Sequence, residues 1–171
     1  MADTVPARVI VMGVTGCGKT TIGALLAGRL GAVFLDGDDY HPEANVAKMA
    51  SGTPLTDDDR WPWLDRLGIA MEEAVGRKGS AVVACSALRR VYRDRLTAAC
   101  AAAPLFVHLE GGRDLIHGRM AARHEHFMPT ALLESQLDTL EPIEADEHAI
   151  VTAIDAEAEH IVARILAQLP G

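Results

Sequence analysis

The chain has 171 residues, of which 49% are hydrophobic and 23% charged, and its formal net charge is −8. This length and composition fit one folded domain with a sizeable core, and they exclude a disordered chain. Because nucleic acid duplexes and anionic membranes bind surfaces rich in Lys and Arg, the acidic balance also argues against either as a partner.

Short continuous apolar runs alternate with helical patterns along the chain, as in a parallel sheet with helices on both faces. The predicted strands comprise residues 8–12, 33–36, 80–85, 105–109 and 149–154. The predicted helices comprise residues 19–30, 42–49, 57–76, 87–102, 114–123, 130–140 and 156–169. Thr56, followed by three aspartates, is the expected N-cap of the third helix. Neither a repeat nor a linker divides the sequence, so we expect a single α/β domain over residues 1–171.

Between the first predicted strand and helix, residues 13–20 match the phosphate-binding pattern G-x-x-x-x-G-K-[ST]. Glycines let the backbone curl until several N–H groups point at one anion, and the following helix adds its positive end. We therefore expect this loop to bind the phosphates of ATP, with Lys19 as a catalytic cation at the β- and γ-phosphates and Thr20 on Mg²⁺. The residues predicted to contact the phosphates are Gly13, Val14, Thr15, Gly16, Cys17, Gly18, Lys19, Thr20 and Thr21.

The second predicted strand ends in three carboxylates, Asp36, Asp38 and Asp39. Ligands of open α/β sheets bind beyond the carboxyl ends of the strands, so these acids should face the phosphate loop. Phosphoryl transfer to a hydroxyl needs one carboxylate to take the proton and another to help hold Mg²⁺. We assign Asp38 as the base and Asp36 as the Mg²⁺ partner through water, although the two roles could be exchanged. The alternative is an acidic turn that merely closes the strand.

Several blocks of residues between the phosphate loop and residue 142 are more specific than the loop itself. They are residues 34–42, with Asp36-Gly37-Asp38-Asp39; Asn45 with Lys48-Met49; residues 54–64, with Trp61-Pro62-Trp63; residues 84–88; residues 92–94; residues 126–129; residues 132–136; and residues 140–142. Together these blocks resemble the gluconokinases, a family of P-loop small-molecule kinases. The resemblance implies D-gluconate as acceptor, 6-phospho-D-gluconate as product, and a three-layer fold with a five-stranded parallel sheet like that of nucleoside monophosphate kinases.

Gluconate carries a carboxylate and a chain of hydroxyls, so its site needs a basic clamp and hydrogen-bonding acids. Arg60 directly follows the aspartates 57–59 and could make a bidentate contact with a carboxylate. An ion pair between Arg60 and that acidic run is the equally open alternative. The other residues predicted to line the acceptor pocket are Asp38, His41, Lys48, Arg89, Arg93, His126 and Gln136.

Arg119 and Arg123 lie about one helical turn apart, on one face of a predicted helix. In this fold class a mobile lid closes over ATP and brings arginines to the transferring phosphoryl group. We therefore expect a lid at about residues 119–130, with both arginines as catalytic residues. The alternative is an exposed basic helix face.

The three cysteines, Cys17, Cys85 and Cys100, lie far apart without a C-x-x-C pair, which favours free thiols in a reducing compartment. The sequence shows neither a basic leader nor an apolar segment of about 18 residues, so we expect a cytoplasmic protein. Two-fold dimers are the commonest assembly for such enzymes, and we expect one here.

Two other functions stay open. A related small-molecule kinase could use shikimate or adenylylsulfate as acceptor, although the block around Trp61-Pro62-Trp63 favours gluconate. A nucleotide-binding switch would use the phosphate loop only for sensing and would need no acceptor pocket. Dependence of ADP release on the sugar acid separates these possibilities.

Overall fold

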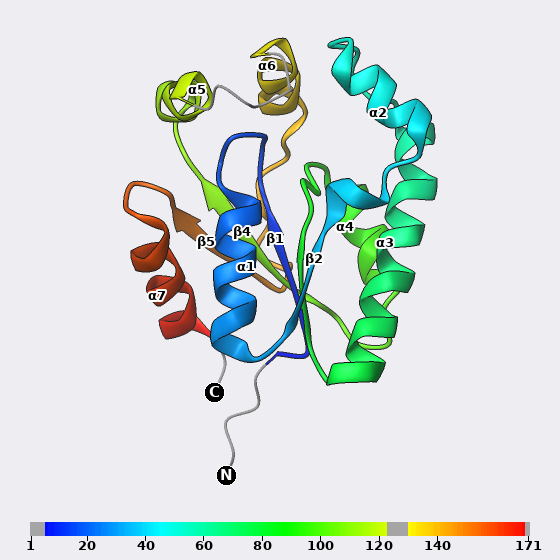
Figure 1. Cartoon of the computed structure of the whole chain (residues 1–171), viewed down its shortest axis with the longest axis vertical. Helices are drawn as coiled ribbons and strands as arrows, with labels where there is room; N and C mark the ends of the chain where they lie inside the picture. Colours follow the sequence, from blue (N-terminus) through cyan, green and yellow to red (C-terminus); the bar gives the residue numbers. More distant parts are fainter. Residues whose placement is uncertain (1–5, 123–129, 170–171) are drawn as a thin grey trace.

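The computed structural model describes residues 6–122 and 130–169, which form one parallel sheet with helices on both faces (Figure 1). The strands are β1 (Arg8–Met12), β2 (Val33–Asp36), β3 (Ala81–Ala84), β4 (Leu105–Glu110) and β5 (Ala149–Ala153). Their order in the sheet is β2-β3-β1-β4-β5. In the centre of the sheet, Val11 pairs with Ala84 of β3 on one side and with Val107 of β4 on the other. The predicted five-stranded parallel sheet is confirmed.

The helices connect the strands and cover the two faces. They are α1 (Lys19–Leu30), α2 (Glu43–Ala50), α3 (Asp57–Lys78), α4 (Arg90–Ala98), α5 (Arg113–Ala122), α6 (Thr130–Thr139) and α7 (Ala158–Gln168), with a short 3₁₀-helix η1 (Gly37–Tyr40) after β2. Helices α1 and α7 cover one face, and α3 and α4 cover the other (Figure 1). Within the described ranges, no helix combines the length and the apolar character that a membrane span requires.

The apolar core has two halves because successive side chains of a strand point to opposite faces of the sheet. On β1, Val9 and Val11 pack toward α1 and α7, whereas Ile10 and Met12 pack toward α3 and α4. All four side chains are fully buried. This burial on both faces explains why the strands read as continuous apolar runs in the sequence.

The helix ends follow local signals where such signals exist. Thr56 caps α3 as predicted: its hydroxyl accepts from the Asp59 N–H at 3.1 Å, and the Asp59 carboxylate accepts from the Thr56 N–H at 2.9 Å. Helix α4 begins at Arg90 and not at the predicted residue 87, because Ala87 has a positive φ of 44° and Arg89 is extended, with φ −105° and ψ 151°. Residues 85–89 therefore form a loop at the carboxyl end of β3.

Parallel strands end at one edge of the sheet, and α2, α5 and α6 lie beyond that edge (Figure 1). The phosphate-binding pattern joins β1 to α1 at the same edge, and η1 follows β2 there. The fold thus brings the glycine-rich loop, the acidic segment and three helices to one end of the molecule. This is the end at which ligands of open α/β sheets bind.

Candidate active site

The glycine-rich loop between β1 and α1 adopts a curled backbone that few side chains would allow. Gly16 and Gly18 have positive φ values of 82° and 94°. Gly18 also stands at the N-cap of α1, where no side chain accepts from the first turn of the helix. Lys19 is folded back over the loop and donates from Nζ to the Val14 carbonyl at 3.1 Å. The loop therefore presents backbone N–H groups, a helix N-terminus and a cation to one place.

The carboxylate of Asp36 lies beside this loop. The Thr20 hydroxyl donates to Asp36 Oδ2 at 3.3 Å, and Asp36 Oδ1 accepts from the Asp38 backbone N–H at 3.0 Å. A hydroxyl and a carboxylate oxygen are ligand types that Mg²⁺ accepts, and Mg²⁺ keeps several waters and phosphate oxygens besides. These two residues therefore fit the ion. Among the described residues there is no group of three or more His, Cys, Asp or Glu side chains that could hold a metal by itself.

A cavity opens next to the loop, on the side of α2 and α3. Its lining residues are Thr15, Gly16, Gly18, Lys19, Thr20, Thr21, Asp36, Asp38, His41, Met49, Pro54, Leu55, Arg60, Trp63, Ala84, Ser86, Leu88, Ser135 and Gln136. The cavity thus brings together Lys19, both predicted carboxylates, and the predicted acceptor residues His41, Arg60 and Gln136. Gln136 reaches it from α6 and accepts from the Thr15 backbone N–H at 2.7 Å. Ser86 and Trp63, which sequence reasoning did not assign to the site, also contribute to the lining.

Arg60 enters the cavity from the first turn of α3 with one end of its guanidinium already held. Its Nη1 donates to the Leu55 carbonyl at 2.7 Å and to the Tyr92 hydroxyl at 2.8 Å. The distance from Nη1 to Asp57 Oδ1 is 3.8 Å. Asp57 has closer partners in Tyr92, at 2.5 Å, and Arg89, at 2.8 Å. Arg60 thus lies near the acidic run and also lines the cavity, and its bidentate contact with a substrate carboxylate stays a prediction.

The hydrogen bonds and charges of this cluster shift the pKa of its carboxylate, Asp57. The hydrogen bond from Tyr92, followed by the charge of Arg89, lowers the pKa of Asp57. Burial and the hydrogen bond to Asp57 raise the pKa of Tyr92. The hydroxyl of Tyr92 therefore stays protonated beside an ionised Asp57, and it can accept from Arg60 while it donates to the carboxylate.

Comparison with known proteins identifies the family. Residues 9–143 match a family model described as an AAA domain. The "Probable gluconokinase" of Rattus norvegicus is 43% identical over 181 residues, which cover 96% of this chain and 98% of that protein. The crystal structure of a gluconokinase from Sinorhizobium meliloti 1021 is 41% identical with a TM-score of 0.85, and the match covers 95% of this chain and 90% of that one. The chain belongs to the gluconokinase family.

Membership in the gluconokinase family confirms the resemblance inferred from the blocks of residues, and it confirms the P-loop kinase fold. Shikimate kinase from Acinetobacter baumannii shares the fold, with a TM-score of 0.56, but is only 20% identical. That lower similarity shows common architecture and nothing about the acceptor.

Three predicted acceptor residues lie outside the cavity lining of the described chain. Lys48 forms an ion pair with Asp59 at 2.7 Å, and Arg89 forms one with Asp57 at 2.8 Å. Both cations are therefore held by carboxylates in the first turn of α3. Arg93 is different, because its side chain is only 1% exposed. The structure does not support the prediction that Arg93 lines the acceptor pocket.

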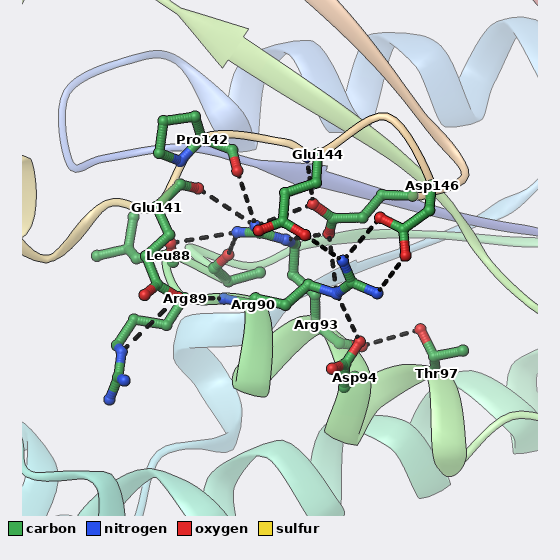
Figure 2. Close-up of polar contacts among 12 residues, drawn as sticks. Leu88, Arg89, Arg90, Arg93, Asp94, Thr97, Glu141, Pro142, Glu144 and Asp146 are labelled. Atoms are coloured by element: carbon green, nitrogen blue, oxygen red, sulfur yellow. Dashed lines mark hydrogen bonds and ion pairs between the residues drawn. The ribbon is translucent and has the colours of Figure 1, made fainter.

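Arg93 instead joins two loops inside the protein (Figure 2). Its guanidinium donates to Glu147 at 2.6 Å and to the carbonyls of Ala87, Leu88, Glu141 and Pro142. The loop that follows β3 is thereby tied to the segment between α6 and β5. Because Leu88 lines the cavity and α6 carries Gln136, this contact supports two walls of the site from behind.

A second cavity lies next to the glycine-rich loop, on the side of α5 and α7. Its lining residues are Gly18, Thr21, Ile22, Leu115, Arg119, Ile154, Asp155, Ala156, Glu157, Ala158 and Ile161. Arg119 donates from Nη2 to the Ile154 carbonyl at 2.6 Å. Sequence reasoning did not assign residues 154–158 to a site, since they form no motif; their only signal is their place after the last strand. The predicted catalytic Arg123, the predicted acceptor residue His126 and most of the predicted lid lie outside the described residues.

Proposed function

We propose that this chain transfers the terminal phosphoryl group of ATP to a hydroxyl of D-gluconate, forming 6-phospho-D-gluconate and ADP. The observation that carries the proposal is one cavity in which the phosphate-binding loop, Asp38 and Arg60 meet. The gluconokinase relatives support gluconate as the acceptor. A switch that only senses nucleotide would have no use for a cavity with an acid and an arginine beside the loop.

In the proposed reaction, a gluconate hydroxyl oxygen forms a bond to the γ-phosphorus while the bond from that phosphorus to the oxygen of ADP breaks. Asp38 takes the hydroxyl proton, and Lys19 stabilises the charge on the β- and γ-phosphates. The free end of the Arg60 guanidinium is positioned to hold the gluconate carboxylate. These groups keep the acceptor and the phosphates in one orientation, which is the main contribution of a protein to phosphoryl transfer.

Thr20 and Asp36 would hold Mg²⁺, Asp36 through a water molecule. When bound, the ion neutralises charge on the phosphates that leave with ADP. The hydrogen bond between Thr20 and Asp36 supports this division of roles over the reverse one, since Asp36 is the acid in contact with the loop.

The base and ribose of ATP would occupy the second cavity, which borders the same loop at Gly18 and Thr21. Arg119 and residues 154–158 are then the predicted contacts of the nucleoside.

The catalytic roles of Arg119 and Arg123, and the lid that contains them, remain predictions. So do the two-fold dimer, the cytoplasmic location, the single domain over residues 1–171, and the absence of nucleic acid and membrane partners.

A coupled assay of ADP formation with a panel of acceptors tests the proposed function. The panel contains gluconate, other sugar acids, shikimate, a neutral polyol, and no acceptor. We expect ADP formation that requires Mg²⁺ and is fastest with gluconate, and we expect Lys19→Ala to lose 10²-fold or more of it. ADP release that is independent of gluconate would identify a switch, and a preference for shikimate would identify the related kinase.

A further inference from the structure

Asn45 is a buried polar residue of α2 whose side chain has a defined orientation. It is 3% exposed. Its side-chain nitrogen donates to the Asp59 backbone carbonyl at 2.9 Å. A carbonyl oxygen only accepts hydrogen bonds, so the group that faces Asp59 must be the NH₂ end of the amide. This contact removes the usual ambiguity between the nitrogen and the oxygen of an Asn side chain.

The same amide nitrogen lies 3.2 Å from Nδ1 of His41. An amide NH₂ has two hydrogens and accepts no hydrogen bond, so its second hydrogen must point to Nδ1. Nδ1 therefore uses its lone pair as acceptor. In a neutral imidazole ring the proton then resides on the other nitrogen, Nε2.

Nε2 of His41 is directed to the acceptor side of the site. It lies 3.9 Å from Asp38 Oδ1, which is too long for a direct hydrogen bond. His41 and Asp38 both line the first cavity, which the proposed function assigns to the acceptor and which is called the acceptor cavity below. A hydroxyl oxygen that reached both groups would accept from Nε2–H and donate to the Asp38 carboxylate.

The plane of the His41 ring is held as well as its tautomer. The ring stacks on Trp63 with the centroids 4.0 Å apart and the planes 19° apart. Trp63 is itself anchored, because its Nε1 donates to the Gly37 carbonyl at 2.8 Å. Gly37 stands between Asp36 and Asp38 in the chain, so the stack links the ring to the segment that carries the two acids.

We propose that Asn45 is a positioning residue that fixes His41 in the tautomer with its proton on Nε2, so that His41 donates a hydrogen bond to the acceptor hydroxyl while Asp38 receives the hydroxyl proton. The inference rests on the proposed transfer to a hydroxyl. It extends that function by assigning the direction of each hydrogen bond at the reacting oxygen. The donor from His41 occupies one lone pair of the hydroxyl oxygen and leaves another for attack on phosphorus.

Burial and the nearby Arg60 keep the His41 ring neutral, although carboxylates also lie near it. Asp38 faces it from η1, Arg60 faces it from α3, and the Lys48–Asp59 ion pair lies behind Asn45. Burial, followed by the charge of Arg60, lowers the pKa of His41 to about 4. Around neutral pH the ring is therefore a neutral donor. Protonation at low pH would place a hydrogen on Nδ1 opposite the Asn45 NH₂ group and break their hydrogen bond.

Nuclear magnetic resonance of the full chain, labelled with ¹⁵N, measures the tautomer directly through long-range correlations between ring protons and ring nitrogens. The His41 signals are assigned by comparison with His41→Gln. We expect the wild-type ring to show Nε2–H at pH 7, and Asn45→Asp to show Nδ1–H, because a carboxylate accepts where the amide donated. Nδ1–H or an average of both tautomers in the wild type would overturn the proposal.

Kinetics then test what the tautomer does. At pH 7, Asn45→Asp should lower kcat/KM for gluconate about 3- to 10-fold, the effect of one lost neutral hydrogen bond, with the KM for ATP unchanged. Val46→Ala, on the exposed side of the same helix, is the matched control and should behave as wild type. A switched tautomer with unchanged kcat/KM would show that His41 does not position the acceptor.

A second pair of variants keeps the test decisive if Asn45→Asp does not fold, as judged by circular dichroism. His41→Gln retains an N–H donor near the place of Nε2, and His41→Leu removes it. We expect His41→Gln to keep several times more kcat/KM than His41→Leu, and equal losses would contradict a donor role. Failure of the proposed function is distinguishable, because a wild type that does not phosphorylate gluconate can still show the Nε2–H tautomer.

Discussion

Two carboxylates that stand two residues apart have different neighbours in this site. Asp36 accepts from the Thr20 hydroxyl beside the glycine-rich loop, whereas Asp38 lies 3.9 Å from the Nε2 atom of His41 in the acceptor cavity. An extended backbone makes both side chains point the same way, but it does not decide what each one meets. Because their surroundings differ, the proposed role of Asp38 as the base and that of Asp36 as the Mg²⁺ partner can be separated by experiment.

Asp38→Asn should lower kcat about 10²-fold or more while the KM for gluconate changes little, because an amide still hydrogen-bonds a hydroxyl but cannot take its proton. Asp36→Asn should instead raise the Mg²⁺ concentration needed for half-maximal rate. Steady-state kinetics across a Mg²⁺ titration measure both effects. If the Mg²⁺ dependence shifts for Asp38→Asn and not for Asp36→Asn, the two roles are exchanged.

Arg60→Lys tests the proposed clamp on the gluconate carboxylate. Lysine keeps the charge but loses the planar fork, and it also loses the contacts to Leu55 and Tyr92 that orient the guanidinium. The lost hydrogen bonding to a charged group should cost about 1.5–3 kcal/mol, or a factor of about 10 to 150 in kcat/KM for gluconate.

The KM for ATP and the weak activity toward a neutral polyol should barely change in Arg60→Lys. Arg66→Lys, at an exposed position of the same helix, is the matched control. Equal losses with gluconate and with the polyol would mean that Arg60 serves Asp57 and not the acceptor. The clamp would then have to be sought at Lys48 or Arg89, which pair with Asp59 and Asp57 in the first turn of the same helix.

At the scale of elements, the junction between β2 and η1 depends on a close approach of two backbones. A Cβ atom at Gly37 would lie 2.3 Å from the Ala84 carbonyl oxygen of β3 and 3.2 Å from Leu67 of α3. The backbone of β3 cannot move aside as the flexible end of a long side chain can. The glycine therefore lets β2 end tightly against β3 and holds Asp36 and Asp38 near the loop.

Gly37→Ala should destabilise the protein by about 1–3 kcal/mol, the usual range for overpacking, and should also impair catalysis because the acids must move. Gly28→Ala is the control: no atom lies within 4 Å of its Cβ position, which is exposed on α1. In a helix that change should stabilise by about 0.5–1 kcal/mol. Urea unfolding measures both values, and a Gly37→Ala protein as stable and active as wild type would refute the packing argument.

At the scale of the whole molecule, the buried Arg93–Glu147 pair couples parts of the chain that are 54 residues apart. Burial alone would raise the pKa of Glu147, but the hydrogen bonds from Arg93 and from the Glu144 backbone N–H lower it on balance. A carboxyl whose pKa is lower in the folded state stabilises the fold above its unfolded pKa, near 4.3. That stabilisation is lost as the pH falls through the pKa that Glu147 has in the folded state.

Glu147→Gln should lower the free energy of unfolding at pH 7 by about 3 kcal/mol, the low end for breaking a buried pair, since Arg93 keeps its backbone carbonyls as acceptors. The difference from wild type should shrink as the pH falls from about 5 to 3, because Glu147 is then protonated in either state. Urea unfolding at several pH values measures the difference. Glu144→Gln removes a solvent-screened ion pair with Arg90 and should cost far less than Glu147→Gln. A pH-independent difference would contradict the role given to the Glu147 charge.

The sequence by itself determined what depends on neighbours along the chain. The apolar run of β1, the amphipathic α1 after its glycines, and the Thr56 capping box all follow from residues a few positions apart, and the structure has them where they were predicted. The glycine-rich loop was equally readable, because its chemistry lies in consecutive backbone groups. The order of the residue blocks was enough to indicate the gluconokinase family.

Only the tertiary structure decided which side chains meet. Arg93 was expected in the acceptor pocket, but its carboxylate partner and two of its four carbonyl partners come from a loop about 50 residues away. Gln136 reaches Thr15 across 121 residues, and Asn45 meets Asp59 and His41 because α2 packs against the start of α3. Arginine, glutamine and asparagine bond equally well to water, to backbone or to a ligand, so residue type alone leaves their partners undetermined. Packing selects one partner, because a buried polar group without one would cost more than the hydrogen bond contributes.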